Sequence, residues 1–414
     1  MGKRIIVLGV GQNNFLSFLY AKLKRHDPEF VITAPFYRDL NKGVSDETWM
    51  YENAQVNNGT SIVSLLKSGF LNLVSLHFYQ TLLFILFVEK KLKKAAHFAK
   101  SQVQAEAFFI QNNNFAEFDT FHFHYMQYSY LRELFLVPKN KKIVCSFWGS
   151  DLLRTSDIMN FYFVKKALQK ATIITCQSIE LREIILSKFG RNLLDKVYIA
   201  KFPLDEKIYQ EIDINSTEIE ILQSFKLRYG YAIDKINILI GHNGSKSNNH
   251  LKIIDALGNL MNKNRLHLIV NLNYAISAKE KPAYKAQLNV ALQKLGCSYV
   301  ILEHFFPKDE LALSRLATDA FIHLPISDAL SGTMTEMLYA SNIVFTGSWL
   351  PYKTFRNIGV VYNEVDDFSS LTEKVDLFVN NYAAEKEAVR GNKQLIKEFF
   401  FNKDVIYTWS QILN

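Results

Sequence analysis

The feature that most constrains the fold is an alternation of short β-type runs with helical stretches, which occurs twice along the 414-residue chain. Alternating strands and helices fold into parallel sheets whose two faces are covered by helices, so the chain is of the α/β class. The predicted strands are Arg4–Val10, Lys142–Phe147, Thr172–Cys176 and Val197–Ala200 in the first series, and Asn237–Gly241, His267–Leu272, Tyr299–Leu302, Ala320–Leu324 and Asn342–Gly347 in the second.

The two series predict two Rossmann-like domains. The pattern weakens and polar residues gather over Phe202–Asp234, with Pro203 near the start, so we interpret this stretch as the interdomain connection. The domains are then residues 1–203 and 204–396, with ligands bound in a cleft between them, at the carboxyl ends of the strands. The last stretch, Lys397–Asn414, has helical periodicity and is predicted to form one separate helix.

Charge is unevenly distributed over the two halves. Up to Pro203 there are 26 Lys and Arg against 16 Asp and Glu, a balance of +10, and the remainder has 22 against 24, a balance of −2. The basic half is therefore expected to meet an anionic partner, such as a membrane surface or a pyrophosphate-linked acceptor. The lysines are scattered and no RNA-binding signature is visible, so nucleic acid is not expected.

The first strand is too short for a signal peptide, and the three cysteines, Cys145, Cys176 and Cys297, form neither a disulfide framework nor a metal-ligand spacing. Both observations favour a reducing, cytoplasmic setting. No run reaches the ~18 apolar residues of a membrane-spanning helix. The nearest is Thr81–Val88, which the basic run Lys90–Lys94 follows closely. It predicts either a buried helix with a solvated basic turn or an element resting on anionic lipid at the inner face of a membrane.

The most informative segment for chemistry is Ile326–Gly347. Ser331, Gly332 and Thr333 stand where a helix should begin, and a helix N-terminus offers unpaired N–H groups and a positive dipole end to a diphosphate. Glu336 lies one turn into that helix, where its carboxylate could accept hydrogen bonds from ribose hydroxyls. Asp328, eight positions earlier, is placed to face the hydroxyls of a transferred sugar. The alternative is an ordinary capped helix with an exposed Glu.

This segment resembles the Glu-x7-Glu region of GT-B glycosyltransferases, with Asp328 in place of the first Glu. The resemblance implies that the first carboxylate contacts the donor sugar and the second the ribose. The following Thr346–Tyr352 also resembles enzymes of surface-polysaccharide pathways in the cell envelope, such as those for lipopolysaccharide. A GT-B fold implies that the last helix crosses back to the first domain, with the donor in the second domain and the acceptor in the first.

A second segment, Gly241–His250, follows a strand and precedes a helix. Gly244, Ser245 and Lys246 suit a loop that faces phosphates, with Lys246 as a point charge. With Asn271–Ala275 and Tyr284, this stretch resembles transferases that add 4-acetamido-fucose to a lipid-linked glycan, over about residues 238–332. That resemblance favours inversion of the anomeric configuration, whereas the Asp328–Glu336 pattern favours retention, and both remain open. The alternative is a plain polar loop.

A third segment, Glu303–Pro325, follows the strand whose loop flanks the nucleobase in GT-B proteins. The resemblance makes His304, Phe305 and Phe306 candidates for donor binding, against simple packing as the alternative. In the first half, His124 and Asp151 lie where GT-B enzymes line the acceptor side, which makes them candidates to orient or deprotonate the acceptor hydroxyl. Gly11 would allow the first loop to approach the reacting sugar closely.

Several absences narrow the function. The sequence has no Asp-x-Asp pair, which argues against metal-dependent GT-A enzymes, and no P-loop. The pattern that starts with Gly9 and Gly11 has no third glycine, so it is not the dinucleotide fingerprint of a hydride-transfer enzyme. The expectation is a glycosyltransferase without metal or cofactor that moves a sugar from a nucleotide diphosphate to a lipid-linked or cell-surface glycan. The alternatives are a sugar-nucleotide 2-epimerase of the same architecture and a non-catalytic nucleotide- or glycan-binding subunit.

Overall fold

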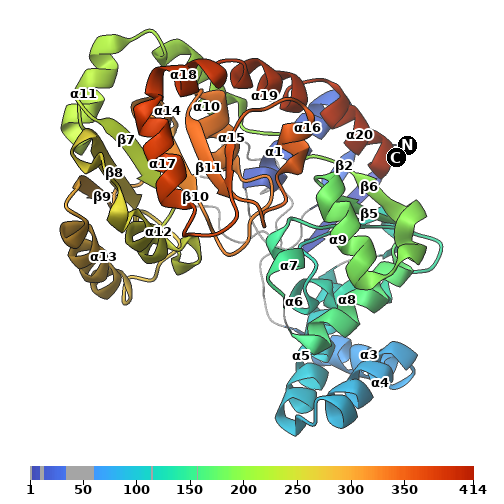
Figure 1. Cartoon of the computed structure of the whole chain (residues 1–414). Helices are drawn as coiled ribbons and strands as arrows, with labels where there is room; N and C mark the ends of the chain where they lie inside the picture. Colours follow the sequence, from blue (N-terminus) through green and yellow to red (C-terminus); the bar gives the residue numbers. More distant parts are fainter. Residues whose placement is uncertain (1, 10–13, 34–59, 113–114, 156) are drawn as a thin grey trace. The chain divides into compact units, whose positions relative to one another are not determined.

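The computed structural model describes residues 2–9, 14–33, 60–112, 115–155 and 157–414. The chain divides into two compact units (Figure 1), one made of residues 1–203 with 403–414 and the other of residues 204–402. Each unit contains one six-stranded sheet in which every observed pair is parallel. The α/β prediction with two Rossmann-like sheets is therefore confirmed.

The sheet of unit 1 has the strand order β2-β1-β3-β4-β5-β6. Its order reverses beside β1, whose neighbours are β2 and β3. Its strands are β1 (Arg4–Gly9), β2 (Val31–Thr33), β3 (Thr120–His124), β4 (Lys142–Ser146), β5 (Ile173–Cys176) and β6 (Val197–Ile199). Its longer helices are α1 (Asn14–His26), α3 (Ile62–Leu73), α4 (Leu76–Leu83), α5 (Leu92–Asn112), α8 (Ile158–Lys170) and α9 (Ile179–Phe189).

The sheet of unit 2 has the order β9-β8-β7-β10-β11-β12. The order reverses between β7 and β10, which is the switch point where open α/β sheets bind ligands. Its strands are β7 (Ile236–Ile240), β8 (Leu266–Asn271), β9 (Ser298–Leu302), β10 (Ala320–His323), β11 (Ile343–Gly347) and β12 (Asn363–Val365). Its longer helices are α10 (Glu206–Asn215), α11 (Ile219–Tyr229), α12 (His250–Ala256), α13 (Lys281–Leu295), α14 (Lys308–Ala317), α15 (Gly332–Tyr339), α17 (Leu371–Asn380), α18 (Tyr382–Ala388) and α19 (Asn392–Phe400).

The buried strands explain why both faces are covered. All five residues of β7 are buried, and because side chains alternate along a strand they feed two separate cores. Ile238 and Ile240 pack into one core with α12, α13 and α17, whereas Leu239 packs into the other with α10, α14 and α15. The continuous apolar runs that predicted these strands therefore reflect burial on two sides.

The C-terminal stretch differs from the prediction. Lys397–Asn414 is not one helix, because α19 ends at Phe400 and a separate helix, α20 (Asp404–Leu413), follows. The last helix crosses back to the first unit as expected, since α20 belongs to unit 1 and packs against α1. Its Trp409 is fully buried, donates a hydrogen bond from Nε1 to the Lys201 carbonyl (2.7 Å) and stacks on Phe202.

The segment Phe202–Asp234, predicted as an interdomain connection, also differs from the prediction. Most of it forms α10 and α11, which pack into unit 2 through Ile208, Ile212 and Phe225. Their polar outer faces lowered the apolar signal of the segment. The strands β2 and β12, of three residues each, and β3 are absent from the predicted strands. The three cysteines are buried and free, as expected.

Candidate functional site

The loops at the switch point of unit 2 are bonded into one framework. The Ile326 N–H donates to the Ser247 carbonyl (2.9 Å), which joins the loop after β10 to the loop after β7. The Asn249 side-chain amide donates to the Leu324 carbonyl (2.8 Å). The Trp349 indole donates to the Pro325 carbonyl (3.0 Å), which adds the loop after β11. The framework fixes the backbone at the carboxyl edge of the sheet.

Backbone strain gathers at the same edge. Asn249, Ala275 and Leu330 have φ values of 58°, 60° and 46°, and they follow β7, β8 and β10 respectively. Left-handed conformations cost non-glycine residues of order 1–3 kcal/mol and cluster at functional sites. Their concentration in three adjacent loops marks this edge as the candidate site.

Asp328 is held by the end of β10. Its Oδ2 accepts a hydrogen bond from His323 Nε2 (2.8 Å), and the same nitrogen lies 3.1 Å from the Tyr352 hydroxyl. Burial disfavours the carboxylate, but the hydrogen bond and charge interaction with His323, together with His242, bring the pKa of Asp328 down to about 2. Asp328 is therefore an ionised, oriented acceptor, as contact with sugar hydroxyls requires.

Among the described residues, one group of three side chains could hold a metal ion. His242, His323 and Asp328 each offer a ligand atom, and these atoms all lie within 4.8 Å of one another. Burial, reinforced by His323, lowers the pKa of His242 to about 3, so its ring is neutral, and its buried Nδ1 has no hydrogen-bond partner. Two imidazoles and a carboxylate suit a borderline ion such as Zn²⁺. Since His323 already donates to Asp328, the cluster is also stable without an ion.

Glu336 lies one turn into α15 and pairs with a buried arginine. Its Oε2 accepts hydrogen bonds from both Nε (2.9 Å) and Nη2 (2.8 Å) of Arg315. Its Oε1 points toward Gly332 at the start of the helix, because a Cβ placed on that glycine would lie 3.8 Å from it. Burial raises the pKa of Glu336, and Arg315 opposes that shift. One oxygen is thus fixed by Arg315 while the other faces the helix N-terminus.

The start of α15 keeps the features that the sequence predicted. Ser331 is the N-cap residue but its side chain makes no capping hydrogen bond. Ser331, Gly332 and Thr333 are all partly exposed. Unsatisfied N–H groups at a helix N-terminus attract anions. Glu336 therefore lies beside this helix start, and Asp328 precedes it by four residues in the loop after β10.

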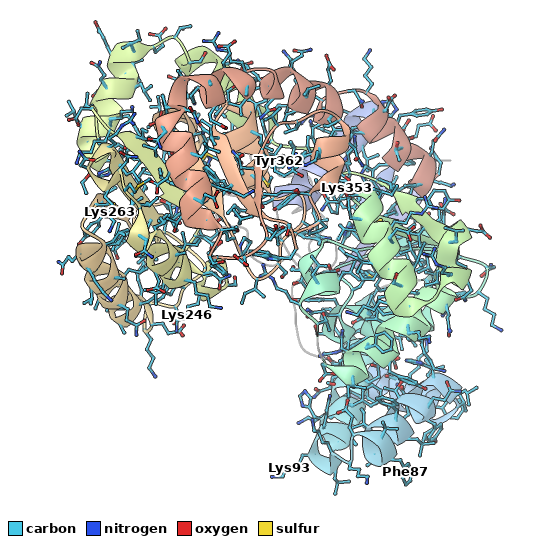
Figure 2. All side chains as sticks on the ribbon, viewed as in Figure 1. Phe87, Lys93, Lys246, Lys263, Lys353 and Tyr362 are labelled. Atoms are coloured by element: carbon cyan, nitrogen blue, oxygen red, sulfur yellow. The ribbon has the colours of Figure 1, made fainter. Side chains whose placement is uncertain are left out.

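The loop after β7 combines internal support with one exposed lysine. A Cβ on Gly244 would lie 2.6 Å from Ile276 Cγ2, so close packing of the backbone requires glycine. Ser245 caps the short helical turn Lys246–Asn248 by accepting from the Ser247 N–H. Lys246 is exposed (Figure 2), forms a 3.4 Å ion pair with exposed Glu280 and lies 5.8 Å from the centre of the Tyr284 ring. Because such surface pairs are weak, Lys246 can turn toward a ligand.

In the loop after β9, the structure contradicts the prediction that Phe306 contacts the donor. Phe306 is only 3% exposed and packs against Phe225 and Tyr229, so its ring has no free face for a base. Its neighbour Phe305 is 68% exposed and is the aromatic ring available in this loop. His304 is exposed, stacks on Tyr229 and lies 3.5 Å from Glu310.

In unit 1, Asp151 is not a free carboxylate. Its Oδ1 accepts the backbone N–H groups of Trp148 (2.9 Å), Gly149 (2.9 Å) and Leu152 (3.1 Å), and its Oδ2 accepts that of Met126 (2.7 Å). Burial raises the pKa of Asp151 to about 6 despite these donors. The predicted catalytic role is therefore wrong, because the carboxylate closes the β4 loop and ties it to the end of β3.

His124 is likewise part of an internal network. Its ring is fully buried, with Nδ1 accepting from the Trp148 indole (3.3 Å) and Nε2 within 2.7 Å of the Tyr20 hydroxyl. That hydroxyl also lies 2.7 Å from His122 Nδ1, and His122 Nε2 lies 2.6 Å from Ser146 Oγ. An indole only donates, so the hydrogen bonds run in one direction from Trp148 to Ser146. Burial first, then His122, keeps the pKa of His124 far below its usual value, which contradicts the role of base.

Gly11 lies outside the described residues. Four further residues shape the site and were not predicted from the sequence: His242, Arg315, His323 and Tyr352. His242 and His323 directly follow or end predicted strands, so their positions at the carboxyl edge were a signal. Arg315 had none, because its pairing with Glu336 joins two helices that are separated in sequence.

The sequence matches no family model and no curated protein sequence. Solved structures do match over the whole chain. HepE of Anabaena in complex with UDP has a TM-score of 0.65 at 11% identity, covering 99% of this chain and 100% of that one. A glycosyltransferase of Rickettsia africae has a TM-score of 0.66 at 13% identity, covering 100% and 99%. Sucrose-phosphate synthase of Thermosynechococcus elongatus has a TM-score of 0.64 at 10% identity, covering 99% and 98%. This chain therefore has the GT-B fold.

The structural role of Asp151 gives a direct prediction. Asp151→Asn replaces one accepting oxygen by a donor that faces N–H groups, so the free energy of unfolding should fall by roughly 2–4 kcal/mol. Urea unfolding of unit 1 measures the change. Asp195→Asn, at an exposed aspartate of the same unit, is the control and should stay within about 0.5 kcal/mol of wild type. Equal stability of Asp151→Asn and wild type would contradict this role.

Proposed function

We propose that the chain is a metal-independent glycosyltransferase that moves a sugar from a nucleoside diphosphate to a lipid-linked or cell-surface glycan. One observation carries the proposal: Glu336 Oε1 points toward the uncapped start of α15, with Asp328 ionised beside the same loop. This arrangement offers a carboxylate to ribose, N–H groups to phosphate and a second carboxylate to sugar. A likeness to HepE structures with UDP and with UDP-glucose supports UDP as the first nucleotide to test.

The chemistry required is a substitution at the anomeric carbon. The bond from that carbon to the diphosphate oxygen breaks, and the diphosphate leaves with the electron pair. The acceptor oxygen forms the new bond and gives its proton to the departing diphosphate oxygen or to water. Negative charge therefore develops on the leaving diphosphate. The helix start at Gly332 and Thr333 and the mobile charge of Lys246 are the groups we propose to stabilise it. Asp328, held by His323 and Tyr352, would orient the sugar.

The acceptor and the location are finer parts of the proposal. We propose that unit 1 binds the acceptor and that the enzyme works at the cytoplasmic face of a membrane. Support comes from the basic balance of residues 1–203 and from the resemblance of Thr346–Tyr352 to surface-polysaccharide enzymes. Neither Asp151 nor His124 is the acceptor base, because both are buried in internal networks.

Nucleotide binding tests the donor site. A thermal-shift panel of UDP, GDP, dTDP, CMP and NAD should show stabilisation by UDP. A ligand at ~100 times its Kd adds about 2.7 kcal/mol to the native state. Glu336→Gln keeps an oxygen for Arg315 but replaces an acceptor by a donor, so the Kd for UDP should rise about ten-fold or more. Glu373→Gln, in the first turn of α17, is an exposed control and should bind as wild type. A shift with NAD alone, or with no nucleotide, would contradict the proposal.

Turnover tests the role of Lys246. Removing one electrostatic partner of a developing charge costs on the order of 10²–10³ in rate. Lys246→Ala should therefore lower kcat for release of the nucleoside diphosphate by that factor, with unchanged thermal stability because the side chain is exposed. Lys294→Ala, an exposed lysine in the last turn of α13, is the control. An unchanged kcat in Lys246→Ala would remove this residue from the mechanism.

Metal removal tests the proposed metal independence. After dialysis against EDTA, turnover should change by less than about two-fold, because the proposed reaction uses no ion. Loss of a catalytic ion would instead cost several kcal/mol of transition-state stabilisation. The opposite result is a loss that Zn²⁺ or Mn²⁺ restores in wild type but not in His242→Ala. That result would make His242, His323 and Asp328 a metal site and overturn metal independence.

A further inference from the structure

Helix α3 has its polarity reversed relative to a helix on the surface of a water-soluble domain. Its buried side chains are Ser64, Ser68 and Asn72, at spacings of four residues. Its exposed face carries large apolar side chains at helical spacing: Ile62, Val63, Leu66, Phe70 and Leu73. A surface helix in water normally buries the apolar stripe and exposes the polar one. Here the polar stripe is inside.

Ser68 and Asn72 are paired with α5, whereas Ser64 accepts a hydrogen bond from the Ser61 hydroxyl (2.9 Å). Glu106 accepts hydrogen bonds from Ser68 (3.1 Å), Asn72 and Gln102 (2.8 Å). Burial is the main cause that raises the pKa of Glu106. A polar interior of this kind lets α3 pack against α5 without its apolar side chains, which remain outside. Proteins in lipid use this arrangement, with polar groups paired inside and apolar ones facing the hydrocarbon.

The apolar surface continues beyond α3. We call residues 62–88 the elbow; it comprises α3, α4 and the π-helical turn η1 (Phe84–Val88). Exposed large apolar side chains run along its whole length, and exposed Leu92 follows it. They are Ile62, Val63, Leu66, Phe70, Leu73, Val74, Leu76, Tyr79, Leu83, Phe87, Val88 and Leu92. Phe87 and Lys93 lie at the same end of unit 1, with their side chains directed away from the fold (Figure 2). Exposed apolar side chains that extend over two consecutive helices mark an interaction surface.

The charges beside the elbow identify its partner. Residues 62–105 contain six lysines and a single acidic residue, Glu89, which pairs with Lys94 (2.8 Å). Lys90, Lys91 and Lys93 are exposed directly after η1. An apolar face bordered by unpaired lysines complements an anionic bilayer, with hydrocarbon next to the apolar side chains and headgroups next to the lysines.

The geometry of the elbow sets the mode of contact. Among the described residues, no single helix is both long and apolar enough to cross a membrane, but α3 and the α4–η1 segment meet these criteria as a pair bent by 76°. Each half has 12 or 13 residues, or about 18–20 Å of helix, which is shorter than the ~30 Å hydrocarbon core. Neither half spans the bilayer.

We propose that the elbow inserts into one leaflet of an anionic lipid bilayer and anchors unit 1 to that surface. Phe70 and Phe87 lie in the hydrocarbon and the lysines at 90, 91 and 93 contact the headgroups. The inference goes beyond sugar transfer, since it concerns only α3, α4 and η1. It specifies how the enzyme reaches a lipid-linked acceptor if the proposed function holds.

Vesicle binding tests the anchor without any sugar substrate. The whole chain should sediment with vesicles of phosphatidylcholine and phosphatidylglycerol, and binding should weaken at high salt because the lysine contribution is screened. In Phe70→Ser/Phe87→Ser, binding should fall at least about ten-fold, because two large apolar side chains leave the hydrocarbon. Both residues are more than 60% exposed, so folding should be unaffected, as circular dichroism would verify.

The control is Ile219→Ser/Leu227→Ser, which removes two equally exposed apolar side chains from α11 in unit 2. It should bind vesicles as wild type. Failure of the wild type to sediment, or equal sedimentation of the elbow variant, would overturn the anchor. So would a lipid-free dimer that the elbow variant dissociates, because a second copy would then cover the patch. None of these outcomes depends on nucleotide binding, so the anchor and the transferase proposals fail separately.

Insertion is distinguished from adsorption by depth. Phe87→Trp should show a blue-shifted emission on vesicle binding and strong quenching by lipids brominated in the acyl chain. The native tryptophans, Trp49, Trp148, Trp349 and Trp409, lie outside the elbow and are subtracted with the wild type. Quenching only by headgroup-labelled lipid would overturn insertion.

Discussion

The buried ion pair between Arg315 and Glu336 is the interaction on which the candidate site depends. Arg315 is at the end of α14 and Glu336 is one turn into α15, so the pair sets the position of one helix relative to the other. Breaking one partner of a buried pair typically costs about 3–5 kcal/mol, because the other charge is left uncompensated. With one carboxylate oxygen taken by Arg315, the other is directed to the start of α15. The hydrogen bond from Ile326 to Ser247 then holds the loops after β7 and β10 together.

The sequence was sufficient for the parts of the fold that rest on local pattern. Strands with a continuous apolar run, such as β7 and β8, were predicted because the run is visible without tertiary information. The equally buried β3 was not, because its threonine and histidines interrupt the run. The short β12 and the helices α10 and α11 were missed because their stability comes from packing against neighbours. In the site, the start of α15 was predicted from its capping residues. The Arg315 and His323 contacts were not, since they join residues that only the fold brings together.

Unit 1 shows the limit of assigning roles from residue type alone. Asp151 and His124 are the residue types that catalysis uses, and they lie near the ends of strands. The polar side-chain atoms of both nevertheless make internal hydrogen bonds. Sequence cannot distinguish a carboxylate that faces a ligand from one that accepts four backbone N–H groups. The elbow is the converse case. The run Thr81–Val88 suggested both a buried helix and a lipid contact, and the structure leaves Leu83, Phe87 and Val88 of that run exposed. The apolar side chains of α3, which precedes it, also lie outside.

The central claim is that a nucleoside diphosphate binds at the carboxyl edge of the unit 2 sheet. Hydrogen exchange measured by mass spectrometry with and without UDP tests it most directly, because it reports where amides become protected. The account predicts slower exchange in residues 242–249 and 326–336, with little change in the α3–α5 region of unit 1. Protection confined to unit 1, or no protection of the start of α15 at saturating UDP, would contradict it.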